Sequence, residues 1–247
     1  IDHSDSLGAA ARFGDGDVQW MTAGKGIVHS EMFPLLNQQQ GLTNDFFQIW
    51  LNLPKVSKMV DPHFKMLWAE SIPEAEIQPG LTLRCIAGSV SPLSVPPSPP
   101  PNSWASNPNS DLAIWIIDLK ANSTWSFPAV PEGVHRSLYA VNGQGIQLNG
   151  HSLPKSHGAF VLDNRQLTVS SGPEAASLLY LQGRPIGEPV VQYGPFVMNS
   201  KAEIIQAYED YQKTAFGQWP WQRDDPVHDP LQGRFAIHAD GRMDLPS

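Results

Sequence analysis

The stretch that decides the fold runs from Gly16 to Met32 and reads Gly-Asp-Val-Gln-Trp-Met-Thr-Ala-Gly-Lys-Gly-Ile-Val-His-Ser-Glu-Met. It ends by placing His29 and Glu31 two residues apart. Side chains two apart on a β-strand project from the same face, so this pair aims an imidazole and a carboxylate into one shared space. An imidazole suits Fe, Zn, Cu and Ni, and the added carboxylate favours an iron-type site with open coordination positions. The pair is therefore half of a metal site.

Glycines inside this stretch have a structural explanation. Gly24 and Gly26 flank Lys25, but the spacing lacks the pattern of a phosphate-binding loop. Glycine adopts positive φ without steric cost, so we expect these two to form the tight turn that swings His29 inward. Side chains alternate along the strand before the turn, and either Gln19 or Met21 is expected to line the metal pocket.

The whole stretch resembles the signature of the pirin family in the cupin superfamily. Two further segments extend the resemblance: Gln48–Leu53 is similar to the family's next strand, and Gln192–Asn199, followed by Lys201-Ala-Glu-Ile-Ile, is similar to its C-terminal signature. The resemblance implies an all-β fold of two cupin domains, each a jelly-roll β-sandwich, with a C-terminal helix. It also implies one mononuclear metal in the first domain.

In the family the metal is held by a His-x-His pair on an earlier strand and by a His-x-Glu pair that matches His29 and Glu31. The resemblance implies that these two residues are metal ligands, with Fe(II) expected and other divalent transition metals as alternatives. Ile1–Gly8 is similar to the turn just after the strand that carries His-x-His, so two of the four implied ligands are missing from this chain. At the position of His3 the family usually has a histidine that is not a ligand, so we expect a structural or surface role for it, with service as a substitute ligand as the alternative.

We therefore expect the first cupin domain to be truncated at its N-terminus. A partial sequence is the simpler explanation, and processing after a signal peptide is the alternative, less favoured because secretory cleavage precedes a domain. An opened sandwich exposes unpaired strand edges, which invite association. Self-association through the edge near Ile1–Leu7 is the expected consequence.

Short strand signals that end at Gly, Pro, Asn or Asp predict an all-β sandwich or barrel. The expected strands are Asp17–Met21, Phe47–Leu53, Thr82–Ala87, Ala113–Leu119, Ser137–Val141, Gly145–Leu148, Gly158–Leu162, Leu167–Ser170 and Ala176–Leu181. One helix is expected over Lys201–Phe216, with Asn199 or Ser200 as its N-cap and Gly217 after its end. After it we expect an irregular tail that wraps over a surface and is pinned by Trp219 and Trp221.

The domain organisation follows from these elements. We expect a partial first cupin domain over residues 1–80, a second over 81–185 and a C-terminal segment over 186–247. Residues 91–110 are rich in proline, set among Ser and Asn. Such a composition favours extended polyproline geometry, so we expect a solvated loop in the second domain, with a docking motif for a partner as the alternative.

Other residues outside the signature give no second metal site. His135, His151 and His157 have no i, i+2 relation on one strand, so we expect loop or surface roles for them. His63, after Asp61-Pro62, is expected in a loop that could touch a substrate.

Composition excludes several classes of protein. The chain has 247 residues, of which 41% are hydrophobic, and a formal net charge of -8, which argues against direct binding to nucleic acid. The single cysteine, Cys85, excludes an internal disulfide, suits a reducing compartment, and has the apolar neighbours of a buried, inert thiol. No apolar run is long enough to span a bilayer, so we expect a cytoplasmic protein without a membrane partner.

The resemblance implies an oxygenase, because bacterial pirin-like proteins include quercetin 2,3-dioxygenases, which open a flavonol ring with molecular oxygen. Glu31 would then be a ligand and also the catalytic group that accepts the proton of the substrate hydroxyl, and the substrate would be a small aromatic molecule. The run from Phe216 to Trp221 is similar to the bacterial, dioxygenase-like members of the family and favours them over its nuclear members. Two alternatives stay open: a non-enzymatic metal-dependent redox sensor or transcription coregulator that binds a protein partner, and a metal-free inactive fragment.

Overall fold

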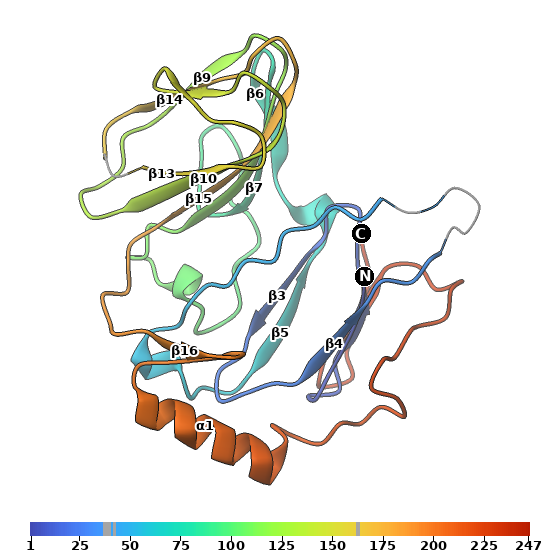
Figure 1. Cartoon of the computed structure of the whole chain (residues 1–247). Helices are drawn as coiled ribbons and strands as arrows, with labels where there is room; N and C mark the ends of the chain where they lie inside the picture. The colour runs from blue at the N-terminus through green and yellow to red at the C-terminus, as the bar shows by residue number, and fades with distance from the viewer. Residues whose placement is uncertain (37–40, 42, 162–163) are drawn as a thin grey trace. The chain divides into compact units, whose positions relative to one another are not determined.

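The computed structural model describes residues 1–36, 41, 43–161 and 164–247, which form mostly β-strands and one α-helix. This confirms the expected all-β fold with a C-terminal helix (Figure 1). The chain divides into two compact units, each discontinuous in sequence. The first contains residues 1–70, 99–104 and 187–247, and the second contains residues 71–98 and 105–186. The expected domain boundaries at residues 80 and 185 stay a prediction.

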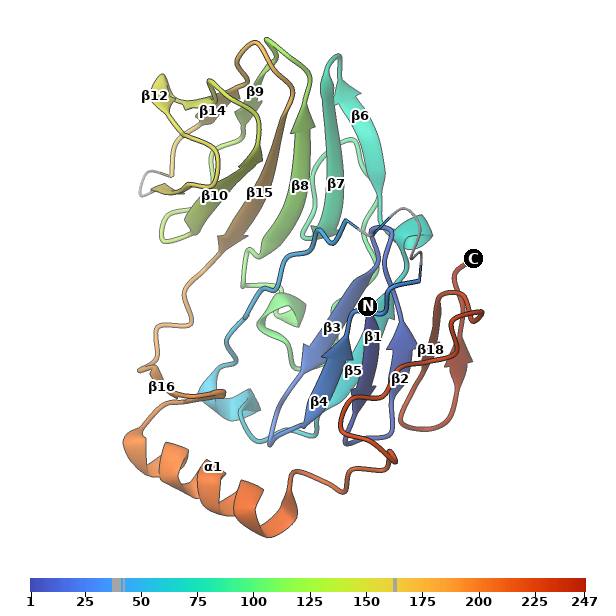
Figure 2. The same ribbon diagram turned by 45° about the vertical axis from the view of Figure 1, so that its right-hand side comes forward.

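The first unit contains an antiparallel sheet with the order β19-β18-β2-β1-β4 (Figure 2). Its strands are, in that order, Met243–Asp244, Phe235–Ile237, Ala10–Arg12, Asp2–Asp5 and His29–Met32. A second, two-stranded sheet pairs β3 (Val18–Thr22) with β5 (His63–Leu67). Apolar side chains from both sheets form the core of this unit: Ala9, Ala11, Phe64, Met66, Trp68 and Ala236.

The segment Ile1–Leu7 differs from its expected state. Asp2–Asp5 is strand β1, paired on one side with β2 and on the other with β4, and all four of its residues are buried. The expectation of an exposed edge there is wrong, because both sides of the strand carry ladder hydrogen bonds. Among the described strands, the edges of this sheet are β4 and β19.

The turn between β3 and β4 needs glycine, as expected from the sequence. Gly24 has φ +52° and Gly26 has φ +130°, a region that side chains with a Cβ rarely adopt. A Cβ on Gly26 would lie 2.5 Å from the ring of Phe216, which closes over the turn from the C-terminal part of the chain. The turn therefore brings the chain to His29 and is covered by Phe216.

Helix α1 spans Lys201–Thr214, two residues shorter than expected, because Ala215 adopts the left-handed conformation that ends the helix. Ser200 is the N-cap, and its Oγ accepts a hydrogen bond from the backbone N–H of Glu203 at 3.3 Å. The helix lies beside the hairpin of β16 (Val191–Tyr193) and β17 (Phe196–Met198), as Figure 1 shows.

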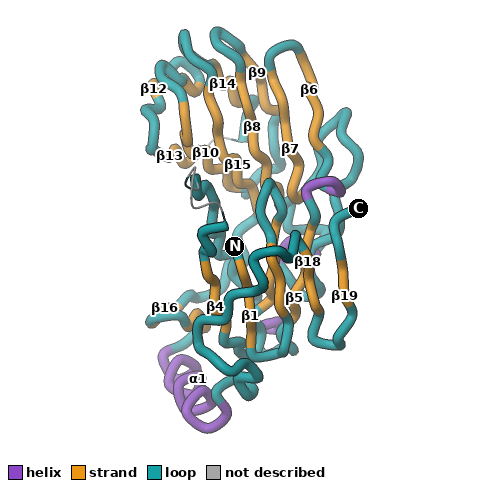
Figure 3. The backbone as a smooth tube through the Cα atoms, turned by 90° about the vertical axis from the view of Figure 1, so that its right-hand side faces the viewer, coloured by secondary structure: helices purple, strands orange, loops and turns teal. Residues whose placement is uncertain are grey.

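The expected irregular tail contains two strands. β18 and β19 add to the sheet of β1 and β2, and Figure 3 shows β4, β1, β18 and β19 next to one another in this sheet. Trp221 pins the tail as expected, since its indole N–H donates to the carbonyl of Asp5 at 2.9 Å. Trp219 instead bonds within the tail, to the carbonyl of Arg223.

The second unit contains two antiparallel sheets. The first has the order β13-β10-β15-β8-β7-β6, with bounds Gly158–Val161, His135–Asn142, Ala176–Gly183, Ala113–Leu119, Leu81–Ala87 and Glu74–Gln78. The second has the order β12-β11-β14-β9, with bounds His151–Ser152, Gln147–Leu148, Leu167–Ser170 and Thr124–Phe127. Their core contains the stacked rings of Trp115, Phe127 and Tyr180, together with Cys85, which is fully buried as expected.

Most expected strands are confirmed within one or two residues, although Leu162 lies outside the described residues. Phe47–Leu53 is wrong, because the segment is irregular and its Phe47 and Trp50 are exposed. His63 is also not in a loop, since it begins β5. Sequence patterns did not predict strands at β1, β2, β5, β6, β9, β12 or β16 to β19.

The proline-rich residues 91–110 are not solvated throughout. Pro96, Pro100 and Ser103 are buried, and Trp104–Ser106 forms a short 3₁₀ helix. Residues 99–104 belong to the first unit, where the hydroxyl of Thr22 donates to the carbonyl of Pro101 at 3.2 Å.

Candidate metal centre

The centre is built by the pairing of β1 with β4. Their antiparallel register sets His3 opposite Glu31 and Asp5 opposite His29. Directly opposite residues share a face of the sheet, as do residues two apart on one strand. The four side chains therefore gather on one face.

Three of these side chains form a cluster that could hold a metal ion. One ligand atom each from His3, His29 and Glu31 lies within 4.8 Å of the others, and no other such cluster of three is found in the described part of the chain. Nδ1 of His29 is 3.7 Å from Oε1 of Glu31. His29 and Glu31, the expected pair of ligands, therefore lie close together on the same face of the sheet. His3 is buried inside the cluster, so the surface role expected for it is wrong, and the structural role stays a prediction.

His3 is held tightly in this place. Its side chain is fully buried, its ring stacks on Phe64 at a centroid distance of 5.1 Å, and its Nε2 lies 3.1 Å from Oδ2 of Asp5. Oδ1 of Asp5 accepts hydrogen bonds from the backbone N–H groups of Leu7 and Ala9, both at 2.9 Å. The Nδ1 atom of His3 has no hydrogen-bond partner among the described residues.

The surroundings of His29 favour its neutral form. Burial lowers the pKa of the imidazole, while the Glu31 carboxylate opposes this shift and His3 reinforces it. A metal ion binds only neutral imidazole, so the lowered pKa prepares His29 for ligation. The donor set of two imidazoles and one carboxylate fits a mononuclear iron-type site with open positions.

Gln19 of β3 reaches the same centre. Its Nε2 donates a long hydrogen bond of 3.4 Å to Oε1 of Glu31, and its buried Oε1 has no partner in the described residues. Of the two residues expected to line the pocket, Gln19 makes this contact, whereas Met21 packs against the apolar core.

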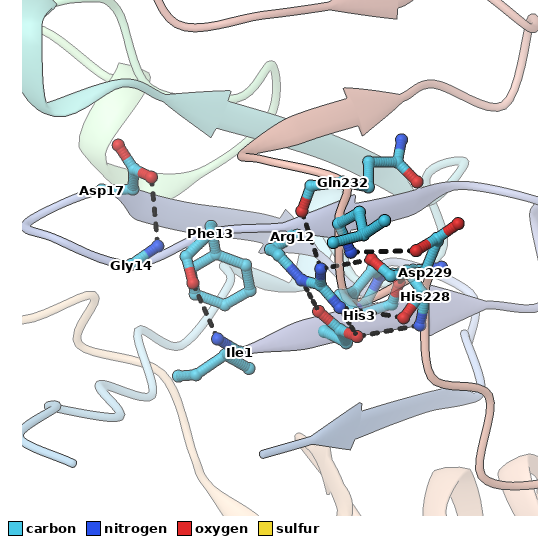
Figure 4. A network of polar contacts seen from close by, with 11 residues as sticks. Ile1, His3, Arg12, Phe13, Gly14, Asp17, His228, Asp229 and Gln232 are labelled. Atoms are coloured by element: carbon cyan, nitrogen blue, oxygen red, sulfur yellow. Dashed lines mark hydrogen bonds and ion pairs between the residues drawn. The ribbon is translucent and has the colours of Figure 1, made fainter. Parts of the chain in front are cut away.

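The opposite face of β1 is tied to the C-terminal tail. Asp2 and Arg12 form a buried, bidentate ion pair with two N–O distances of 2.7 Å. The remaining Arg12 N–H groups donate to the carbonyls of His228, Asp229 and Gln232, and Figure 4 shows these residues around the guanidinium. His228 also donates its backbone N–H to Asp2 and places Nε2 3.1 Å from the carbonyl of His3. The tail therefore fixes β1 from behind the cluster.

The histidines of the second unit lie apart from any such cluster. His135, His151 and His157 are exposed. Nδ1 of His157 lies 3.0 Å from the carbonyl oxygen of Lys155. Their expected surface roles are confirmed. None of the helices that the structure describes has the length and apolarity required to cross a membrane.

The chain matches two family models. The model described as "Pirin" matches residues 1–51, and the model described as "Pirin C-terminal cupin domain" matches residues 114–217. A pirin-like protein from Solanum lycopersicum is 37% identical over 214 residues, which cover 85% of this chain and 68% of the relative. Pirin-1 from Arabidopsis thaliana is 37% identical over 222 residues, covering 88% of this chain and 71% of the relative.

A solved structure agrees with these relatives. The crystal structure of quercetin 2,3-dioxygenase from Acinetobacter baumannii matches with a TM-score of 0.73 and 30% identity, covering 88% of this chain and 72% of that protein. The match confirms the expected cupin fold. Together, the signature from Gly16 to Met32, the family models and the relatives show that this chain belongs to the pirin family.

Proposed function

We propose that this chain carries the metal centre of a dioxygenase of the quercetin 2,3-dioxygenase type, which opens a small flavonol-like aromatic substrate with molecular oxygen. The observation that carries the proposal is the convergence of two imidazoles and one carboxylate within 4.8 Å. Such a set with open positions is typical of non-haem Fe(II) oxygenases. The similarity to a quercetin 2,3-dioxygenase structure supports the substrate class.

His29 and Glu31 are the proposed metal ligands, with Fe(II) as the expected metal and other divalent transition metals as alternatives. When bound, the metal supplies Lewis acidity toward a substrate hydroxyl and the redox chemistry that oxygen requires. Burial keeps His29 in the neutral form that ligation needs.

Glu31 has a second task in the proposal, which is to accept the proton of the substrate hydroxyl. A carboxylate within hydrogen-bond reach of a hydroxyl can act as a general base. The amide N–H of Gln19 donates to Oε1 of Glu31 and orients it. The Oε1 of Gln19, which has no partner among the described residues, is then an acceptor that a second hydroxyl of the substrate can use.

The test compares the chain, purified without chelators, with a His29→Ala, Glu31→Ala double variant. We expect bound iron and flavonol-dependent oxygen uptake in the parent chain and neither in the double variant. A His157→Ala variant, changed at an exposed histidine of the second unit, should retain both. Metal binding without oxygen uptake would contradict the dioxygenase assignment, and metal retained by the double variant would contradict the site.

A second candidate function is metal-dependent association with a protein partner, here tested for a second copy of this chain. Exposed apolar side chains in the same unit favour it: Phe33, Leu35, Leu36, Phe46, Phe47 and Trp50. Contiguous exposed apolar patches mark association sites, and among these side chains the rings of Phe33 and Phe46 lie together at a centroid distance of 5.5 Å. Light scattering with and without added metal tests this candidate, which predicts a change in association state.

A further inference from the structure

The starting observation is a pair of strained residues at the end of α1. Ala215 has φ +48° and Phe216 has φ +50°, so two consecutive residues with side chains adopt the left-handed conformation. Ala215 ends the helix, since its N–H donates to the carbonyl of Tyr211 at 2.8 Å. The helix end does not require a second such residue, and a positive φ is unusual for one as bulky as Phe216. Such a conformation persists only where the surroundings hold it, and it often marks a functional region.

Two hydroxyl groups hold the backbone of Phe216. Its N–H donates to Oγ1 of Thr214 at 3.1 Å, and its carbonyl accepts a hydrogen bond from the hydroxyl of Ser6 at 2.9 Å. Its ring makes an edge contact with Phe196 at a centroid distance of 5.8 Å and lies 5.3 Å from the ring of Tyr211. These contacts together fix the direction in which the ring points.

The ring lies against the turn between β3 and β4. A Cβ on Gly26 would lie 2.5 Å from the ring, so only glycine permits the ring to approach the backbone this closely. A Cβ on Gly24 would collide with the carbonyl of Val60, which also accepts a hydrogen bond from the N–H of Lys25 at 2.9 Å. Figures 1 and 2 both show α1 next to this turn. The turn is therefore held by Val60 at one glycine and by Phe216 at the other.

The contacts of Phe216 also lead to His29. The Ser6 hydroxyl that donates to Phe216 accepts a hydrogen bond from the N–H of Val28 at 3.1 Å. The N–H of Ser6 donates to the carbonyl of Val28 at 2.8 Å. Val28 directly precedes His29, the first residue of β4. The backbone is thus fixed immediately before His29 by a residue that is bonded to Phe216.

We propose that Phe216 is a positioning residue for His29, which it restrains by holding the turn from Gly24 to Gly26 and the peptide at Val28. The inference rests on the proposed function, in which His29 is a metal ligand, but the restraint itself depends on neither metal nor substrate. A side chain held in place before its ligand arrives loses less conformational entropy on binding. The strained backbone of Phe216 is then explained, because it aims the ring at Gly26.

The variant Phe216→Ala tests the proposal in the metal-free chain. Phe216 is only half-buried, so the fold should survive its loss. The amide hydrogens of Lys25, Gly26 and Val28 are all hydrogen-bonded. We expect them to exchange with solvent at least about tenfold faster, because local opening of the turn becomes easier. The hydrogen-bonded amide of Leu153 in the second unit should exchange at the parent rate.

The ring of His29 separates positioning from a purely structural role. In Phe216→Ala we expect its ¹H–¹³C resonances to shift and broaden, while those of His157 in the second unit stay unchanged. Phe216→Tyr keeps the ring and should match the parent chain in both measurements. Tyr193→Ala is the matched control, since it removes an exposed ring whose contact is with Tyr208 on the same helix. It should leave the turn amides and His29 unchanged.

Turn amides that exchange at the parent rate in Phe216→Ala would overturn the proposal. Faster exchange with unchanged His29 resonances would also overturn it, because Phe216 would then support the turn alone. If Phe216→Ala does not fold, Phe216→Leu decides by the same two measurements, since leucine keeps the apolar bulk without a flat ring against Gly26. A loosened turn and a shifted His29 in a chain without flavonol-dependent oxygen uptake would support this inference and contradict the proposed function alone.

Discussion

His3 and Glu31 lie directly opposite each other in the antiparallel pair of β1 and β4, so the cluster depends on the register of two strands. A shift by one residue would send His3 to the other face of the sheet. The register is held from behind by Asp2, Arg12 and the tail. The geometry of the metal centre is thus tied to contacts far away in sequence.

The first prediction concerns Glu31→Gln, which keeps the size of the side chain and removes its charge. An amide oxygen is a poorer ligand than a carboxylate for a transition metal. We expect a loss of Co²⁺ affinity of more than about 100-fold, beyond the usual cost of losing a supporting residue. Competition with a chromophoric chelator measures it. Affinity within about threefold of the parent chain would exclude Glu31 as a ligand.

The second prediction concerns Arg12→Met. The change leaves the fully buried Asp2 carboxylate without its bidentate partner and also removes the bonds to the tail. Breaking a buried ion pair by removing one partner costs about 3–5 kcal/mol. We expect a loss of this size in the free energy of unfolding, measured with urea.

Its control is the double variant Asp2→Leu, Arg12→Met, which removes the stranded charge. Replacing both partners by apolar side chains is often neutral or stabilising, so the double variant should be more stable than Arg12→Met alone. Equal stabilities would show that the tail contacts of Arg12, and not the ion pair, account for the loss.

The third prediction concerns Gly26→Ala. The new methyl group would meet the ring of Phe216 at 2.5 Å and would sit on a backbone with φ +130°. Such strained positions cost about 1–3 kcal/mol. Gly14→Ala, where a Cβ meets nothing within 4 Å, should change stability by much less. Thermal unfolding of the two variants measures the difference, and equal melting temperatures would contradict the strain at Gly26.

The fourth prediction concerns the pH dependence of stability. Burial raises the pKa of the Cys85 thiol from 9.0 to about 11. Because the folded pKa is the higher one, this contribution to stability is fully present below pH 9.0 and is lost as the pH rises toward about 11. At pH 10 we expect the free energy of unfolding to have fallen by about 1 kcal/mol through this group.

Cys85→Ala is the control for this effect, since it has no thiol to titrate. Its free energy of unfolding should be lower at pH 8, because a core side chain is shortened, but should fall less between pH 8 and pH 10. The thiol of the folded parent chain should also react slowly with iodoacetamide at pH 8, because the reactive thiolate is scarce. A parallel fall in both proteins would contradict the raised pKa.

The sequence by itself determined the parts of the molecule whose signals are local. The alternation of side chains placed His29 and Glu31 on one face. Gly24 and Gly26 indicated a turn with positive φ, because residues without a Cβ adopt such φ values without strain. The capping residues located the start of the helix near Ser200. Each of these features depends on neighbours along the chain, so a pattern of a few residues is enough to predict it.

Only the tertiary structure decided the place of His3 and Asp5. Nothing local marks the segment Asp2–Asp5 as a central strand, because its polar residues are buried partly through partners distant in sequence, which are β4 on one side and the C-terminal tail. The same reason explains the failure at Phe47–Leu53, whose strand-like pattern finds no partner strand among the described residues. Strand pairing joins residues that sequence patterns treat separately, and the metal cluster is assembled by such a pairing.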